Sequence, residues 1–217
     1  MKSLIYVIVD PQKVFEEERK PWVPLIVSIL IALVYFILIQ TTLRQEILAK
    51  SLEYISNLPE EQKQRAMAAL HSNTRLIAGL ITIILMIPIK VLILGFIYNA
   101  SVPIFGGEIT FLKSFTVVAF ANFVSSLSAI VKMPIALFTR NPIVRTDLGI
   151  LFGELKGYLP AVLSQVDIFT IWSLLILAIG LEKYGKIKRS NAYLLVAIFW
   201  ITYIFLIYPL LVARRMV

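Results

Sequence analysis

Residues 22–40 read WVPLIVSILIALVYFILIQ, an apolar run that contains no charged side chain. A helix needs about 20 apolar residues to cross the ~30 Å hydrocarbon core of a bilayer, because lipid offers no partner for an unpaired backbone group. The run therefore predicts a membrane-spanning helix, and Pro21 precedes it at a position where a missing N–H does no harm. Four further stretches have the same character: residues 76–99, 111–131, 166–180 and 192–212.

These stretches predict the fold class: an all-α integral membrane protein, one domain over residues 1–217, built as a bundle of five transmembrane helices. Aromatic side chains typical of membrane interfaces stand near the ends of the stretches: Trp22, Tyr98, Trp172, Tyr193 and Tyr208. Met133-Pro134 follows the third stretch and is expected to break or kink its helix.

The overall composition excludes a water-soluble globular domain. Of the 217 residues, 59% are hydrophobic and 16% are charged, with a mean hydropathy of +0.86, whereas a soluble domain is roughly 45–50% apolar and about a quarter charged. The lack of cysteine excludes disulfides, thiolate catalysis and cysteine-ligated metals. In a membrane protein the net charge of +8 indicates contact with anionic lipid headgroups, so no nucleic-acid partner is expected.

Two inserts separate the predicted spans. Residues 43–73 have apolar side chains at helical spacing and a capping-type restart at 57–60, which predicts two amphipathic helices on the membrane surface; a docking platform for a partner is the alternative. Residues 132–165 contain three glycines and Pro160, so we expect an interfacial or re-entrant element there. Ahead of the first span, residues 12–20 predict a short interfacial helix with Asp10 as its N-cap and Pro11 at its first position.

Positive charge in short loops marks the cytoplasmic side of a membrane. With five spans, nine basic residues lie on the side of the N-terminus and eleven on the other side, so the totals do not decide the orientation. The densest cluster lies in the shortest loop and consists of Lys183, Lys186, Lys188 and Arg189. This cluster predicts a cytoplasmic N-terminus.

The side chains that catalysis requires are few. His71 is the only histidine, which excludes the paired histidines of zinc proteases, and a solvated surface position is its simpler interpretation. Consecutive glutamates at 16–18 fan around a helix and cannot share one ion. We therefore expect neither catalysis, nor a bound metal, nor a cofactor.

Lys90 is the most informative single position, because a lysine near the centre of a spanning helix costs about 2.5–3.5 kcal/mol on insertion scales. It either serves a function, with Asp167 or the carbonyls freed by Pro88 as partner, or extends along the helix toward the interface at Tyr98-Asn99. For Asp167 the simpler interpretation is an N-cap of the fourth span.

The third stretch carries small and polar residues at spacings of three and four, namely Ala119, Asn122, Ser125, Ser126 and Ala129. Such a face is typical of close helix packing in membranes, and a substrate path is the alternative. Gly106-Gly107 after Pro103 predicts a tight turn.

Together these landmarks resemble the Yip domain family, five-span membrane proteins named for interaction with Ypt/Rab GTPases, and in particular its shorter prokaryotic members. The resemblance is carried by Asp10-Pro11 with Phe15, Leu58-Pro59-Glu60-Glu61, Phe105-Gly106-Gly107, the stretch Val166 to Trp172 leading to Gly180, and Ser190-Asn191-Ala192. The Asp-x-Phe-x-x-Trp pattern that starts at Asp167 and ends at Trp172 is the most specific of these. The resemblance implies five helices, a cytoplasmic N-terminus, a place in a prokaryotic cytoplasmic membrane and no established catalytic residues. The eukaryotic members of the family are associated with vesicle trafficking and organelle membrane shape.

Two functions follow as hypotheses. The first is a non-enzymatic membrane protein that organises lipids or partner proteins, with anionic headgroups, another membrane protein or a second copy of itself as partner. Its candidate contacts are Lys90, Gly106, Gly107, Asp167, Trp172 and the loop residues Lys183, Lys186, Lys188 and Arg189. The alternative is a small permease or the membrane subunit of a transporter, using Lys90 and a polar path between spans.

Overall fold

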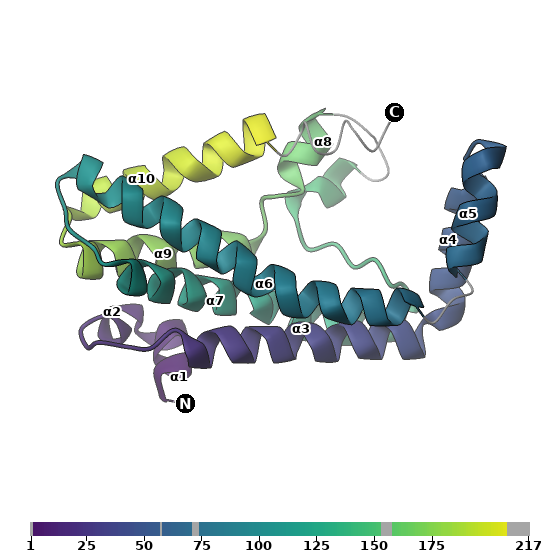
Figure 1. Ribbon diagram of the computed structural model, residues 1–217, viewed down its shortest axis with the longest axis horizontal. Helices are drawn as coiled ribbons and strands as arrows, with labels where there is room; N and C mark the ends of the chain where they lie inside the picture. The colour runs from purple at the N-terminus through teal and green to yellow at the C-terminus, as the bar shows by residue number, and fades with distance from the viewer. Residues whose placement is uncertain (1, 57, 71–73, 153–157, 208–217) are drawn as a thin grey trace.

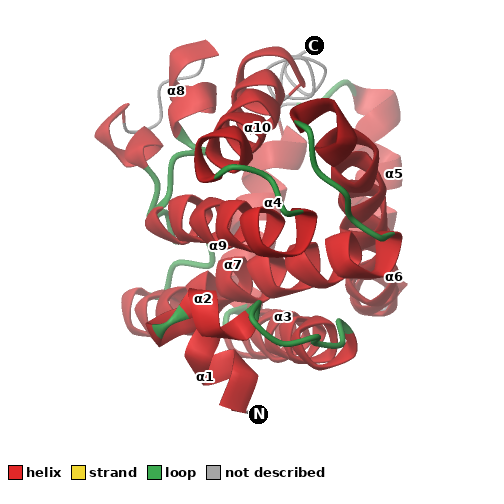
Figure 2. Ribbon diagram, turned by 90° about the vertical axis from the view of Figure 1, so that its left-hand side faces the viewer, coloured by secondary structure: helices red, strands yellow, loops and turns green. Residues whose placement is uncertain are grey.

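The computed structural model describes residues 2–56, 58–70, 74–152 and 158–207. Every regular element in these ranges is a helix, and the one β-type pairing there is an isolated bridge between Asp147 and Asp167. Figure 1 shows α3, α6, α7 and α9 running along the long axis of the molecule, and Figure 2 shows the same helices and their connecting loops after a quarter turn.

The elements follow one another in a simple order. They are α1 (Lys2–Val9), α2 (Pro11–Val14), α3 (Trp22–Thr42), α4 (Arg44–Ser56), α5 (Glu60–Leu70), α6 (Thr74–Ser101), the 3-10 helix η1 (Val102–Phe105), α7 (Phe111–Thr139), the 3-10 helix η2 (Leu148–Phe152), α8 (Tyr158–Leu163), α9 (Ile168–Gly185), α10 (Arg189–Thr202) and the π-helix η3 (Tyr203–Ile207).

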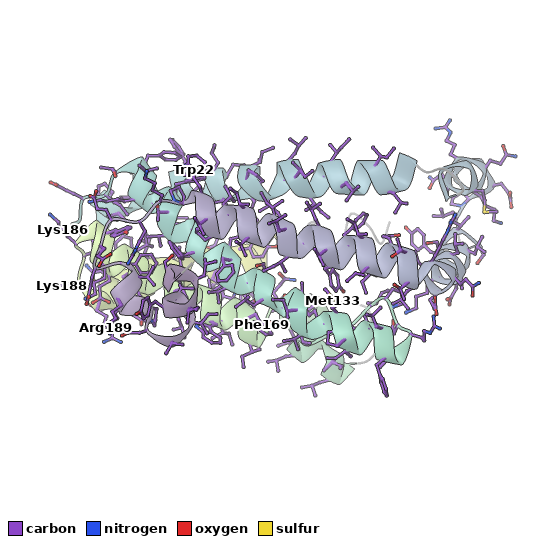
Figure 3. The ribbon with its side chains drawn as sticks, turned by 90° about the horizontal axis from the view of Figure 1, so that it is seen from below. Trp22, Met133, Phe169, Lys186, Lys188 and Arg189 are labelled. Carbon is purple, nitrogen blue, oxygen red and sulfur yellow. The ribbon has the colours of Figure 1, made fainter. Side chains whose placement is uncertain are left out.

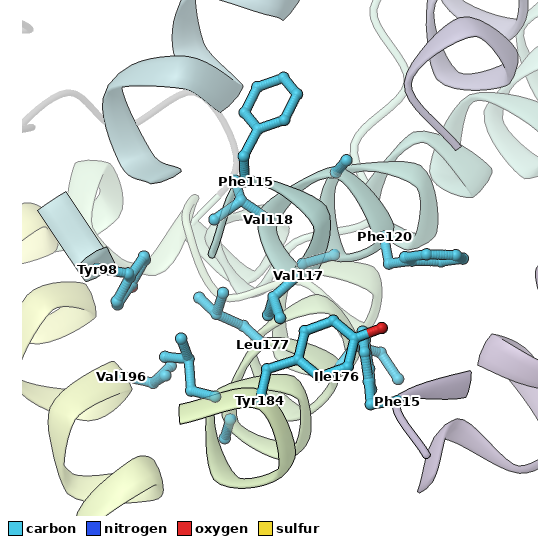
Figure 4. Packing of buried hydrophobic residues seen from close by; sticks show 14 of the residues in the cluster. Phe15, Tyr98, Phe115, Val117, Val118, Phe120, Ile176, Leu177, Tyr184 and Val196 are labelled. Carbon is cyan, nitrogen blue, oxygen red and sulfur yellow. The ribbon is translucent and has the colours of Figure 1, made fainter. Parts of the chain in front are cut away.

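The centre of the bundle is α7, which packs against α9, α3 and α6. In its most apolar stretch 56% of the residues are buried, against 11% in α6. Two polar contacts hold α7 to its neighbours: the Ser114 hydroxyl donates to the Gly95 carbonyl at 2.7 Å, and the Asn122 amide donates to the Ser28 hydroxyl at 3.1 Å. Figure 4 shows Val117 of α7 and Leu177 of α9 within this core.

Four helices are long and apolar enough to cross a membrane: α3, α6 with η1, α7 and α9. Exposed isoleucines and leucines cover the outer sides of α3 and α6, as lipid contact requires. The fifth predicted span, 192–212, is found as a shorter apolar helix at Arg189–Phe205, and its last residues lie outside the described ranges. Five spans are therefore an expectation, and four are supported by length and composition.

Of the two outcomes expected at Pro134, a break or a kink, the break was wrong. Helix α7 continues through Pro134 to Thr139, so residues 132–139 of the predicted second insert belong to the spanning helix. Proline removes one donor, and the rest of the helix retains its backbone bonds. The extra turns are stabilised because Ala136 is buried against Ile39 and Leu43 at the end of α3. The rest of the insert is a loop, η2 and α8, with residues 153–157 outside the described ranges.

The predicted helix at 12–20 is also shorter than expected. Only Pro11–Val14 is helical, with Pro11 in the first turn, and the Asp10 side chain makes no capping hydrogen bond. The following residues are held by the core: the Phe15 ring is 5.4 Å from that of Tyr184, and the Tyr184 hydroxyl donates to the Glu17 carbonyl at 2.6 Å and accepts the Arg19 N–H at 3.0 Å. Figure 4 shows the Phe15 and Tyr184 rings beside each other. These contacts outweigh the helical pattern of residues 15–20.

The first insert contains the two predicted helices, α4 and α5, which stand across the bundle direction at the end where α3 finishes (Figure 1). Lys50 of α4 donates to the Asn141 side chain at 2.8 Å, and Arg140 lies 3.3 Å from Glu46. These contacts join α4 to the end of α7. The placement of both helices on a membrane surface stays a prediction.

Candidate functional site

A polar cavity of about 200 Å³ lies where α9 begins. Three lining residues come from α7, three from the start of α9 and three from the segment that connects these helices. They are Ser125, Ser128 and Lys132; Asp167, Phe169 and Thr170; and Asp147, Ser164 and Gln165. The lining is mostly polar, although it lies between helices that have the length and composition of membrane spans.

The cavity exists because α9 is shorter than α7. The two helices run antiparallel, with Gly180 against Val117 and Asp167 near Lys132. Helix α9 therefore begins opposite Lys132, whereas α7 continues to Thr139. The connecting segment lines the space beyond the start of α9 with polar side chains, and part of this space stays open as the cavity.

Asp167 is the central residue of the cavity wall. One carboxylate oxygen, Oδ1, accepts the Phe169 N–H at 2.8 Å, which confirms the predicted N-cap, and Oδ2 accepts the Thr146 hydroxyl. The Lys132 ammonium is 3.9 Å from Oδ2. The aspartate is 8% exposed, and Lys132 supplies the opposite charge that a buried carboxylate requires.

A second charge pair lies beside the first. Arg145 lies 2.8 Å from Oδ1 of Asp147, and the Gly149 N–H donates to the same oxygen at 2.9 Å. The cavity lining thus carries one positive side chain, Lys132, and two negative ones, Asp147 and Asp167, and Arg145 pairs with Asp147 from outside the lining. Within the described ranges no group of three His, Cys, Asp or Glu side chains could hold a metal ion.

Lys90 does not meet Asp167. It is exposed on α6 and forms no hydrogen bond or ion pair with any described residue. The reason is helical phase: Val91 and Tyr98 face the core, and one residue turns a helix by about 100°. The side chain therefore points away from the bundle, and the partner of Asp167 is Lys132.

The basic cluster gathers at the opposite end from the cavity. Lys183 lies in the last turn of α9, Lys186 follows it with a left-handed φ of 53°, and Lys188 and Arg189 begin α10. Lys186, Lys188 and Arg189 are exposed, and none of the four has a carboxylate within 4 Å in the described part of the chain. Figure 3 places these three side chains at one end of the molecule, away from Phe169 and Met133.

The Gly106-Gly107 pair forms the turn before α7. Gly106 has a φ of 78°, a conformation that only glycine adopts without strain, and its N–H donates to the Pro103 carbonyl. Gly107 packs against the backbone of Gly185, where a Cβ atom would overlap the carbonyl oxygen. Trp172 is partly buried on α9 and packs against the hydrophobic core.

A family model described as the Yip1 domain matches residues 5–210. The chain belongs to the Yip1 domain family. Membrane protein YknW of Bacillus subtilis (strain 168) is 36% identical to this Yip1-domain protein over 101 residues, which are 45% of this chain and 43% of YknW. The match thus covers less than half of that relative. No solved structure matches the chain.

Several motif residues of this Yip1-domain protein meet in space at the basic end. The Asn191 amide donates to the Phe105 carbonyl at 3.2 Å, which joins the start of α10 to η1. A Cβ atom on Gly180 would overlap Val117 and come close to Phe15, so the glycine allows α7, α9 and the N-terminal segment to pack closely. Motifs that are far apart in the sequence thus form one packed end of the bundle.

Lys132 is the functional candidate that sequence analysis missed. In the sequence, Lys132 was assigned to the basic residues of the loops between spans, because the third span was expected to end at residue 131. A signal was present: Ser125, Ser128 and Lys132 recur at spacings of three and four and share one helix face. Continuing the polar helix face past Ser126 to Ser128 and Lys132 would have placed Lys132 on the third span.

Replacing Lys90 with leucine is expected to leave the melting temperature of the Yip1-domain protein unchanged or to raise it. No described group loses a partner, and leucine is favoured over lysine by about 3 kcal/mol at a lipid-facing position. Thermal unfolding of the purified protein in detergent measures the effect, and Val91→Lys, which places the charge on the buried side one residue along, is the matched control. A Lys90→Leu variant as unstable as that control would show that Lys90 has an internal partner.

Proposed function

We propose that this Yip1-domain protein is a non-enzymatic membrane protein that gathers anionic lipids or a partner protein at its basic end. The observation that carries the proposal is the set of Lys183, Lys186, Lys188 and Arg189, none of which forms an ion pair within 4 Å with a described carboxylate. Each basic residue near an anionic membrane surface contributes about 1 kcal/mol of attraction. Four such residues together supply enough electrostatic attraction to concentrate anionic headgroups or to bind an acidic protein surface.

The orientation is part of the same proposal. The basic end also carries the exposed Lys20 just ahead of α3, and positive charge in short connections favours the cytoplasmic side. We therefore place the N-terminus and the α9–α10 connection in the cytoplasm, and the α4–α5 pair on the other side.

The packing of the bundle supports this function over the permease. Between the cavity and the basic end, α7 presents Val117, Phe120 and Val124 to the core, and α9 presents Ile176 and Leu181. All five side chains are at most 1% exposed. A solute path from the cavity would have to cross this apolar layer, and Lys90 lies outside it.

Charge reversal tests the proposal. The variant Lys183→Glu, Lys186→Glu and Lys188→Glu is expected to bind phosphatidylglycerol at least about tenfold more weakly than the wild type at low salt, because three attractive charges become repulsive. Binding of a fluorescent short-chain phosphatidylglycerol to the purified protein in detergent measures this, and added salt should reduce the difference. Proteins that co-purify with the wild type are compared in parallel.

The matched control reverses three exposed basic residues at the other end: Arg44→Glu, Lys50→Glu and Arg65→Glu. It changes the net charge by the same amount and should retain wild-type lipid binding and co-purification. If the first variant keeps both properties as well, the proposed function is wrong.

A further inference from the structure

We propose that the cavity at the start of α9 binds the phosphate-bearing headgroup of a membrane phospholipid, with Lys132 as its cationic contact. The inference rests on the proposed function in that a lipid is bound, but it places a defined lipid site at the opposite end of the bundle from the basic cluster. Three features support it: the depth of the cavity, the unused hydrogen-bond donors in its wall, and the apolar surface beside it.

The depth of the cavity suits a phosphate group. The rings of Trp22 and Phe115 contact each other at 6.1 Å between centroids, and because aromatic rings are enriched at membrane interfaces we take their level as one boundary of the hydrocarbon core. At a helical rise of about 1.5 Å per residue, Lys132 lies roughly 26 Å further along α7. Since the hydrocarbon core is about 30 Å thick, the Lys132 ammonium lies close to the second boundary, where phospholipid phosphates begin.

The cavity lining contains several hydrogen-bond donors that no described residue uses. The nearest acidic atom to the Lys132 ammonium is 3.9 Å away, which is an ion pair too long to be a hydrogen bond. The hydroxyls of Ser125, Ser128 and Thr170 donate to no described residue. Asp167 already accepts from Phe169 and Thr146, so the ligand that fits is rich in acceptors, as a phosphodiester is.

The surface beside the cavity selects a lipid over free phosphate. Leu148 and Ile168 are next to lining residues in the sequence and are 46% and 67% exposed, and Leu151, in the 3-10 helix that starts at Leu148, is 78% exposed. A headgroup in the cavity would leave its acyl chains against these side chains and against the bilayer. An inorganic ion or a sugar phosphate would leave them uncovered.

Native mass spectrometry of the protein, released from detergent after addition of phosphatidylglycerol, tests the site. At high salt, which screens the basic end, the wild type is expected to retain one tightly bound lipid in the cavity, and Lys132→Met to bind that lipid about tenfold or more weakly, because a charge-assisted contact is lost. Lys132→Arg should restore binding. Lys113→Met, which removes a lysine from the other end of α7, is the matched control and should bind as the wild type does.

Two further experiments test the cavity without removing Lys132 and test which part of the lipid is recognised. Because Lys132→Met removes the counter-charge of Asp167, the double variant Ser125→Ala and Ser128→Ala probes the cavity without changing its charge, and it should also weaken binding. Diacylglycerol, which lacks phosphate, and glycerol 3-phosphate, which lacks acyl chains, should both fail to displace the bound lipid. Displacement by either compound overturns the assignment to a phospholipid.

The test separates this inference from the proposed function. Loss of lipid in the basic-end variant with full retention in both cavity variants would overturn the cavity site and leave the proposed function standing. Loss in the cavity variants with full retention in the basic-end variant would overturn the role of the basic end and support the cavity. Retention in all of them overturns both.

Discussion

Replacing Asp167 with alanine is expected to lower the free energy of unfolding by about 2–4 kcal/mol. The substitution removes the N-cap of α9, which contributes about 1 kcal/mol, and leaves the Lys132 ammonium without its counter-charge. The larger part of the effect comes from the charge, because Lys132 has 26% of its side chain exposed and only part of its charge can be hydrated. Reversible unfolding in mixed micelles measures the difference.

Two companion variants separate the contributions. Asp167→Asn keeps the capping acceptor and loses the charge, so its stability should lie between those of the wild type and Asp167→Ala. Glu108→Ala removes an exposed carboxylate elsewhere and should change stability by less than about 0.5 kcal/mol. If Asp167→Ala proves as stable as Glu108→Ala, the cavity charges are solvated and the description of a buried pair is wrong.

Gly107→Ala is expected to destabilise the protein by about 1–3 kcal/mol, the range for overfilling a packed site. A Cβ atom there would overlap the Ile187 side chain, which can move, and the Gly185 carbonyl oxygen, which cannot move freely. That carbonyl is held by the Glu108 N–H at 3.0 Å, so the loop before α7 and the end of α9 would have to separate. Thermal unfolding in detergent measures the loss.

The neighbouring glycine provides the control. Nothing lies within 4 Å of a Cβ atom added to Gly106, and its φ of 78° is a conformation that asparagine tolerates better than other residues. Gly106→Asn should therefore cost less than Gly107→Ala. The reverse order would show that backbone conformation, rather than contact with Gly185, makes this turn require glycine.

Much of the fold could be predicted from the sequence because its signals are local. About twenty apolar residues in a row predict a spanning helix whatever their neighbours are. The ends of α3 and α6 lie within two residues of the predicted ends. Asp167 as N-cap and the turn at Gly106 also depend only on neighbouring residues. The family was recognised from short motifs, and the match over residues 5–210 confirms it.

The errors arose where distant residues decide the outcome. Pro134 looked like a helix end, but Ala136 is buried against Ile39 and Leu43, residues about a hundred positions away, and this packing keeps α7 helical. Residues 15–20 looked helical, but Phe15 and the backbone of Glu17 and Arg19 are bound to Tyr184. Local propensity was outweighed by burial and hydrogen bonding in both cases.

The sequence by itself determined that this protein lies in a membrane, where its four long apolar helices lie and which family it belongs to, because these depend on hydropathy and motifs within single segments. The tertiary structure decided which charges act together. A single step of about 100° along α6 turns Lys90 toward lipid while Val91 is buried. Because α9 begins opposite Lys132 while α7 continues beyond it, Lys132 lies beside Asp167 and a polar cavity is left at this level. The register and rotation of two packed helices are decided by their contacts with each other, so the sequence of either helix alone does not predict this pairing.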